Sequence, residues 1–256
     1  MAIRLAAAVL LTLATTMSAH AGERLDAIKA RGTLLVGTTG DYKPFTFRRE
    51  DGTYYGADIV MADQLARRLN VRLQFVPTTW STMTGDFTAG RFDVAMGGIT
   101  VLPARAEKGT FSPITFVDGK RPVARCADKD RFTSVEAIDQ PGVRVVVNPG
   151  GANADFARAN IKRATVTVHK DNATVFDEII ANRADVMITD GIEVDHQAAI
   201  HPELCPTRVP AAFTRLEKAY WIQSDPDLVR EVAAVVDGAM ASGDWSRTLI
   251  EAQKAP

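Results

Sequence analysis

The chain has 256 residues, with 30 lysines and arginines against 31 aspartates and glutamates and a formal net charge of −1 at pH 7. This length allows one large or two small domains. Because the charges nearly balance and no basic patch stands out, the composition argues against a nucleic-acid partner and favours a small ligand.

The first 21 residues have the pattern of a secretory signal peptide. A basic start that includes Arg4 precedes an apolar stretch at residues 5–17, which is too short to span a bilayer. Ala19 and Ala21 then give the small-residue pattern of a cleavage site. We therefore expect a mature chain that begins near Gly22, has no membrane span, and is periplasmic if the host is Gram-negative.

After residue 21, short apolar strands alternate with amphipathic helices. In the first half the patterns predict strands at 33–38, 71–76 and 92–96 and helices at 57–70 and 80–89. In the second half they predict strands at 143–147, 165–168, 184–188 and 218–222 and helices at 152–160, 173–181 and 227–240. Such alternation is typical of a largely parallel sheet covered on both faces, which binds ligands at the carboxyl ends of its strands.

The order of elements predicts an α/β fold with two lobes. Residues 22–119 and 218–256 are expected to form lobe 1, and residues 120–217 lobe 2. Each lobe would be a mostly parallel sheet flanked by helices, and two hinge crossovers would join the lobes. A cleft between hinged lobes suits a buried small molecule.

The chain has two cysteines, Cys126 and Cys205. In an oxidising compartment an isolated pair favours a disulfide over two free thiols. So few soft ligands argue against a metal site, and His169, His196 and His201 lack metal-site spacing. We expect these three histidines at the surface, and no bound metal.

Two acids follow the predicted strand at 184–188. Asp190 and Glu193 lie three residues apart. At a strand end such a pair can bind an ammonium group, or can keep one carboxyl protonated for chemistry. The same spacing is also used to cap a helix N-terminus. These residues alone leave both interpretations open.

Three segments, at residues 97–100, 104–106 and 110–114, resemble the part of periplasmic amino-acid-binding proteins in which an arginine binds the α-carboxylate of the ligand. Arg105 occupies the matching position, and Thr100 lies in the same part of the chain. The resemblance implies the two-lobe periplasmic binding protein fold. Residues 101–105 lack the acidic residue that usually precedes this arginine.

A wider set of blocks resembles the periplasmic cyclohexadienyl dehydratases. These blocks lie at residues 38–45, 77–80, 138–143, 148–153, 156–160, 189–193 and 201–205. Those enzymes share the binding-protein fold and convert prephenate to phenylpyruvate and arogate to phenylalanine. The blocks span both lobes in the same order, and the cysteine positions agree. The resemblance implies a lyase that works without metal or organic cofactor on a small dianionic substrate.

The dehydratase reaction assigns a role to each acid. Loss of water and carbon dioxide makes the ring aromatic, so the protein must orient the dianion and protonate the departing hydroxyl. Glu193 is the expected general acid, with a pKa raised by burial and by the charge of Asp190. Asp190 is expected to bind the α-ammonium group of arogate as well.

The remaining expected substrate-binding groups come from both lobes. Arg105 can bind a carboxylate through two parallel hydrogen bonds. The turn at Gly151 offers backbone N–H groups and a helix N-terminus to another carboxylate, with Asn153 as a further donor. Lys43 is a third candidate cation, and Tyr42 and Trp80 could enclose the ring. Each group also has a structural alternative: the glycine turn could be only a tight connection, Lys43 a solvated loop lysine, and Tyr42 and Trp80 core aromatic residues.

A second function from another class fits the same sequence. A solute-binding protein of an amino-acid ABC importer would use Arg105 and Asp190 to bind its ligand and would change nothing. Glu193 discriminates the two functions, because a carrier that has Asp190 for the ammonium gains nothing from another buried acid. Neither function needs a membrane after signal cleavage, and no oligomeric state is predicted.

Overall fold

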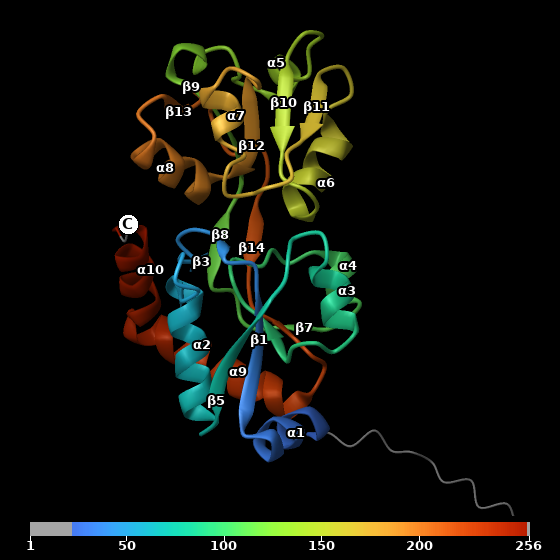
Figure 1. Cartoon of the computed structure of the whole chain (residues 1–256), viewed down its shortest axis with the longest axis vertical. Coiled ribbons are helices and arrows are strands. Elements are labelled where there is room, and N and C mark those ends of the chain that lie inside the picture. The colour runs from blue at the N-terminus through green and yellow to red at the C-terminus, as the bar shows by residue number, and fades with distance from the viewer. Residues whose placement is uncertain (1–21, 255–256) are drawn as a thin grey trace, which may run out of the picture.

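The computed structural model describes residues 22–254, so the predicted signal peptide at residues 1–21 lies outside the described part. The described chain forms two lobes, one above the other, joined by a two-stranded connection (Figure 1). β8 (Phe116–Asp118) leads from the first lobe to the second, and β14 (Leu216–Lys218) returns antiparallel to it. The predicted two-lobe α/β fold with two hinge crossovers is confirmed.

The first lobe is built on a five-stranded sheet. Its strands, in spatial order, are β5 (Arg72–Pro77), β1 (Thr33–Thr38), β6 (Val94–Ala95), β15 (Trp221–Ile222) and β7 (Thr110–Phe111). Only β15 runs against the other four, because it pairs antiparallel with both neighbours. A small antiparallel sheet adds β2 (Asp41–Tyr42), β3 (Thr46–Arg48) and β4 (Tyr54–Tyr55).

Helices cover both faces of this sheet, and the alternation along β1 explains how. Leu34 and Val36 point into a core shared with four helices, whereas Leu35 packs on the opposite side. The four helices are α1 (Glu23–Arg31), α2 (Ala57–Arg68), α9 (Pro226–Ser242) and α10 (Asp244–Lys254). The opposite side holds α3 (Met83–Thr88), and the short α4 (Pro103–Ala106) follows β6.

The second lobe repeats the plan. Its sheet has the order β11 (Thr165–Val168), β10 (Arg144–Val147), β12 (Val186–Asp190), β9 (Lys120–Arg125) and β13 (Leu204–Pro206), with β9 alone running against the rest. The core on one face of this sheet contains residues from α5 (Val135–Ile138) and α6 (Gly151–Asn160). The core on the other face contains residues from α7 (Asp177–Ile180) and α8 (Gly191–Ile200). A short 3-10 helix, η1 (Cys126–Asp128), follows β9.

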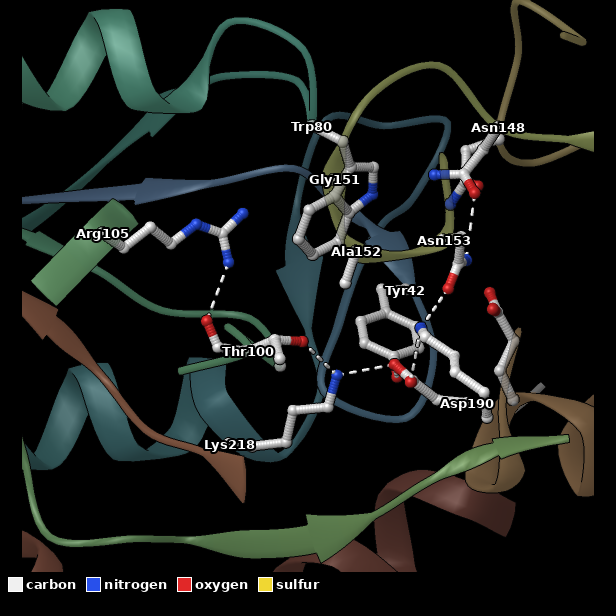
Figure 2. A pocket seen from close by; sticks show the side chains of 14 residues that line it. Tyr42, Trp80, Thr100, Arg105, Asn148, Gly151, Ala152, Asn153, Asp190 and Lys218 are labelled. Atoms are coloured by element: carbon white, nitrogen blue, oxygen red, sulfur yellow. Dashed lines mark hydrogen bonds and ion pairs between the residues drawn. The ribbon is translucent and has the colours of Figure 1, made fainter. Parts of the chain in front are cut away.

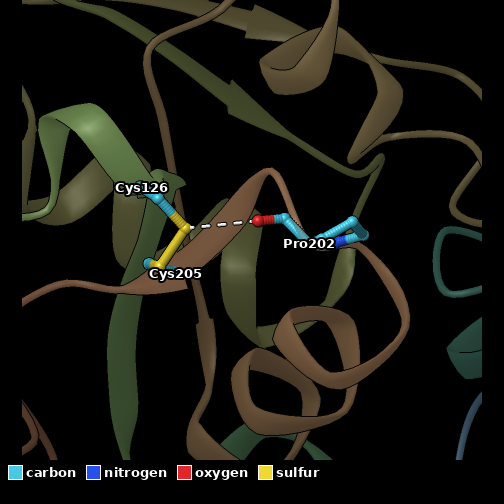
Figure 3. Close-up of a disulfide and its surroundings, with 3 residues drawn as sticks. All are labelled: Cys126, Pro202 and Cys205. Carbon is cyan, nitrogen blue, oxygen red and sulfur yellow. Dashed lines mark hydrogen bonds between the residues drawn. A yellow bond between two sulfur atoms is a disulfide. The ribbon is translucent and has the colours of Figure 1, made fainter.

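The predicted disulfide is present in the second lobe. Cys126, the first residue of η1 directly after β9, is bonded to Cys205 on β13, the strand that pairs with β9 (Figure 3). The bond joins residues 79 positions apart, so it links β13, near the end of the second lobe's chain segment, to β9 at its beginning.

Two local expectations are wrong. The predicted strand at 218–222 is divided, because Lys218 ends the hinge strand β14 whereas β15 belongs to the sheet of the first lobe. The histidines were expected at the surface, but His196 is only 7% exposed. It lies on α8, a helix that the strand and helix patterns did not include, and its Nε2 has no hydrogen-bond partner among the described residues.

Candidate active site

A cavity lies where the two lobes meet. Its lining residues come from both lobes and from the hinge: Tyr42, Trp80, Gly98, Thr100, Arg105, Lys120, Asn148, Gly151, Ala152, Asn153, Asn172, Asp190, Glu193 and Lys218. Eight of the nine predicted site residues are in this set, and Lys43 is the exception. Most of the predicted groups are therefore brought together at one pocket.

Direct contacts hold the two lobes together around the cavity. The hydroxyl of Tyr42 donates to Oδ2 of Asp190 at 2.5 Å, and Asn172 Nδ2 donates to the backbone oxygen of Asp41 at 3.0 Å. Gly150 has φ +73°, and a Cβ there would lie 2.8 Å from Cα of Ser81 on the other lobe. The lobes thus approach each other closely enough to exclude a side chain at position 150.

Arg105 is a buried cation that forms no salt bridge with any residue from 22 to 254. It lies in the single turn of α4, which Pro103 begins, and it is 5% exposed. Its Nη1 donates to the backbone oxygen of Thr100 at 2.9 Å, so most of its donors stay available. Burial lowers its pKa to about 10, which still leaves it charged at neutral pH. A buried charge of this kind needs an anionic partner, and the cavity is where a ligand carboxylate could meet it.

Asp190, at the end of β12, is surrounded by protein cations. Lys120 Nζ lies 2.7 Å from Oδ1, and Lys218 Nζ lies 2.6 Å from Oδ2. Burial alone would raise the pKa of Asp190, but the ammonium groups of Lys218 and Lys120 outweigh it and hold the pKa well below its usual range. Figure 2 shows Arg105, Thr100, Lys218 and Asp190 in a continuous row of contacts. An ammonium group from a ligand would have to compete with these two lysines for Asp190.

The candidate cations of the site differ from the expected one. Lys43 does not line the cavity, and its Nζ lies 4.2 Å from the centre of the Phe47 ring. Lys120 and Lys218 line the cavity in its place; Lys120 begins β9, two residues after the connecting strand β8, and Lys218 ends the connecting strand β14. The sequence could have pointed to Lys120 and Lys218, because each lies in or next to a segment that crosses between the lobes, where a buried charge needs a partner.

Glu193 lies in the first turn of α8 and is 5% exposed. Burial is the main cause that raises its pKa, to about 7; a hydrogen bond from Thr189 lowers the pKa, and the charge of Asp190 raises it further. The helix-cap interpretation of the two acids does not hold, because Asp190 makes no side-chain cap bond. The N–H of Ile192 donates instead to Asp118 at 2.8 Å.

The glycine turn before α6 faces the cavity, but Asn153 is not the free donor that was expected. Gly151 has φ +69° and lines the cavity with Ala152 at the start of a ten-residue helix. The amide nitrogen of Asn153 donates to Asn148 at 3.0 Å and to Thr189 at 2.9 Å. Its donors are thus already used within the protein.

The aromatic wall is made by Tyr42 and Trp80, whose rings meet edge to face at 5.8 Å. Trp80 is fixed by a hydrogen bond of 3.0 Å from Nε1 to Asp41. Phe45 is fully buried and packs against Phe116 and Trp245 rather than lining the cavity. Among residues 22–254 no cluster of histidine, cysteine, aspartate and glutamate is arranged to hold a metal ion.

Comparison with known proteins agrees with this architecture. The chain is 45% identical, over 91% of its length and 87% of the relative's, to cyclohexadienyl dehydratase of Pseudomonas aeruginosa. It is 29% identical, over 72% of its length and 68% of the relative's, to the L-cystine-binding protein TcyJ of Escherichia coli. These values confirm the resemblance to the cyclohexadienyl dehydratases.

Solved structures give the same result. The ancestral amino acid-binding protein AncCDT-1, a precursor of cyclohexadienyl dehydratase, is 32% identical with a TM-score of 0.82, over 90% of this chain and 99% of the other. A point variant of the ancestral cyclohexadienyl dehydratase AncCDT-3 is 45% identical with a TM-score of 0.55, over 91% and 97%. The model of the bacterial extracellular solute-binding proteins, family 3, matches residues 34–251. The chain therefore belongs to the family 3 bacterial extracellular solute-binding proteins.

Proposed function

We propose that this chain is a cyclohexadienyl dehydratase, a lyase that converts prephenate to phenylpyruvate and arogate to phenylalanine. The observation that carries the proposal is Glu193, a buried carboxyl group in the cavity with a pKa of about 7. About half of the molecules then hold its proton at neutral pH. The 45% identity to the Pseudomonas dehydratase supports the same function.

The balance of charges around the cavity supports a dianionic substrate. Arg105, Lys120 and Lys218 are the cations that line it, and Asp190 is one anion. With Glu193 protonated, the lining carries two more positive than negative charges, which matches the two carboxylates of prephenate. Charges that are buried together interact several times more strongly than in water. The site is thus suited to binding and orienting such an anion.

In the proposed mechanism, Arg105 binds the carboxylate of the side chain and the start of α6 faces another part of the anion. Tyr42 and Trp80 enclose the ring and exclude water. Glu193 transfers its proton to the ring hydroxyl, and the C–O bond breaks to release water. The electrons of the breaking C–C bond enter the ring as carbon dioxide leaves. Glu193 ends the step as a carboxylate and regains its proton from solvent.

The same proposal includes export to the periplasm. The family is described as extracellular, and residues 1–21 have the signal-peptide pattern described above. In residues 22–254 there is no helix long and apolar enough to cross a membrane.

The test is incubation of purified protein with prephenate, with phenylpyruvate followed by its enolate absorbance in alkali. We expect turnover by the wild type and by Lys43→Ala, which alters a lysine outside the cavity. The competing function is that of a solute-binding protein of an amino-acid importer, which the fold and the relationship to TcyJ support. No turnover, together with calorimetric binding of an unmodified amino acid, would establish the carrier and exclude the enzyme.

A further inference from the structure

A directed chain of hydrogen bonds leads to Glu193 from inside the second lobe. The ammonium group of Lys120 donates to Oδ1 of Asn153. Nδ2 of Asn153 donates to Oγ1 of Thr189 at 2.9 Å, and Thr189 donates to Oε2 of Glu193. Thr189 is fully buried and Lys120 is 1% exposed, so water does not compete for these bonds. Figure 2 shows Asn148 and Asn153 joined by a hydrogen bond.

The chemistry of Lys120 fixes the direction of this chain. An ammonium group can only donate, so the atom of Asn153 that faces it must be the amide oxygen. The amide nitrogen then faces Thr189 and Asn148, where it donates to both. Because the oxygen of Thr189 accepts from this amide, its single hydrogen is left for Glu193. Oε2 of Glu193 is therefore an acceptor in this arrangement.

A carboxylic acid carries its proton on one oxygen, and only that oxygen can donate. If Oε2 accepts from Thr189, the proton belongs on Oε1. We propose that Thr189 is a positioning residue that keeps the acidic proton of Glu193 on Oε1, and that Lys120 and Asn153 set the direction of its hydroxyl. The inference rests on the proposed role of Glu193 as the general acid.

Thr189 has two expected effects on the reaction. It holds one rotational and protonation state of the carboxyl group, so that each closed molecule presents its proton the same way. Its hydrogen bond also stabilises the carboxylate that remains after proton transfer, consistent with its lowering the pKa of Glu193. The other charges that act on Glu193 are Asp190, Lys120 and Asp41, and a substitution at Thr189 leaves all three in place.

A matched pair of variants separates the hydroxyl from the shape of the side chain. Thr189→Val keeps the branched shape and the pairing of β12 with Arg121 on β9 but removes the hydroxyl, whereas Thr189→Ser keeps the hydroxyl. For Val we expect kcat for prephenate to fall by about 10- to 100-fold, the effect of losing a hydrogen bond to a charged group, with KM within about threefold. The pH at which kcat declines should rise. For Ser, kcat should stay within about threefold of the wild type.

A spectroscopic measurement tests the chain without turnover. In infrared difference spectra recorded across the titration of Glu193, the protonated C=O band is assigned by its loss in Glu193→Gln. Thr189→Val should move this band to higher frequency, because the carbonyl oxygen Oε2 loses its donor, and Thr189→Ser should restore it. An unmoved band, or equal kcat for Val and wild type, would overturn the proposal. If the wild type lacks dehydratase activity, the proposed function fails, while the band still decides whether Thr189 directs the proton.

Discussion

Replacing Glu193 with glutamine removes the transferable proton while keeping the size of the side chain and an oxygen that can accept from Thr189. At a pKa of about 7 roughly half of the Glu193 groups are protonated at pH 7, whereas at the ordinary value of 4.5 the share would be about 1 in 300. The raised pKa thus supplies about 150 times more of the protonated form. General acid catalysis is worth about 10²- to 10⁴-fold, so we expect kcat of Glu193→Gln to fall by this factor, with KM little changed.

The pH dependence gives the second half of this prediction. Glu193 acts in its protonated form, so kcat of the wild type should be highest below its pKa and fall about tenfold per pH unit well above it. Bound dianion should raise the pKa and move this decline above pH 7. The assay is initial-rate formation of phenylpyruvate from pH 5 to 9, about the range over which Glu193 titrates. A kcat of Glu193→Gln within about threefold of the wild type, or a wild-type kcat that rises through pH 8, would refute the reasoning.

Four further substitutions test other parts of the site and fold. Arg105→Lys loses the planar pair of donors, so KM for prephenate should rise on the order of 10-fold or more in the same assay. Lys43→Ala should change kcat/KM by less than about twofold, because the ammonium group of Lys43 lies against aromatic rings outside the cavity. A larger loss would show that Lys43 takes part in binding or catalysis. Gly150→Ala should lower kcat and raise KM, since the added Cβ would lie 2.8 Å from Ser81 in the closed form, and unchanged kinetics would show that closure tolerates it. The double variant Cys126→Ser, Cys205→Ser opens a link over 79 residues and should lose about 2–5 kcal/mol in chemical denaturation; an unchanged midpoint would contradict this.

The arrangement of the lobes could be predicted because periodicity and topology agree along most of the chain. The strand at 33–38 was predicted with its observed bounds, since its apolar residues pack on both faces and Gly32 and Gly40, both with positive φ, flank it. Asp190 and Glu193 were found for a related reason, because they come at the end of a predicted strand, and the carboxyl ends of parallel strands meet at one edge of each sheet. Arg105 was found instead through the resemblance of its segment to the amino-acid-binding proteins.

The lysines of the hinge could not be predicted in the same way. Whether Lys218 points into the cleft depends on where β14 ends and β15 begins, and the sequence there reads as one strand. Lys43 was predicted to line the cavity but does not, because its ammonium group lies over the rings of Phe47 and Tyr55 on the small sheet. The role of Asn153 depends on contacts with residues more than 30 positions away, such as Thr189, and no local pattern reports these.

The surplus of two positive charges around the cavity has a consequence for the end of the catalytic cycle. In the proposed reaction, once carbon dioxide has gone and Glu193 has given up its proton, the dianion prephenate has become the monoanion phenylpyruvate and the surplus has dropped to one. Coulomb attraction scales with the product of the charges, so the hold on phenylpyruvate is roughly a quarter of that on prephenate. The proposed reaction therefore weakens the electrostatic attraction that holds the product in the cavity. A transport protein binds a solute that does not change, so its ligand is released only when another factor opens the lobes.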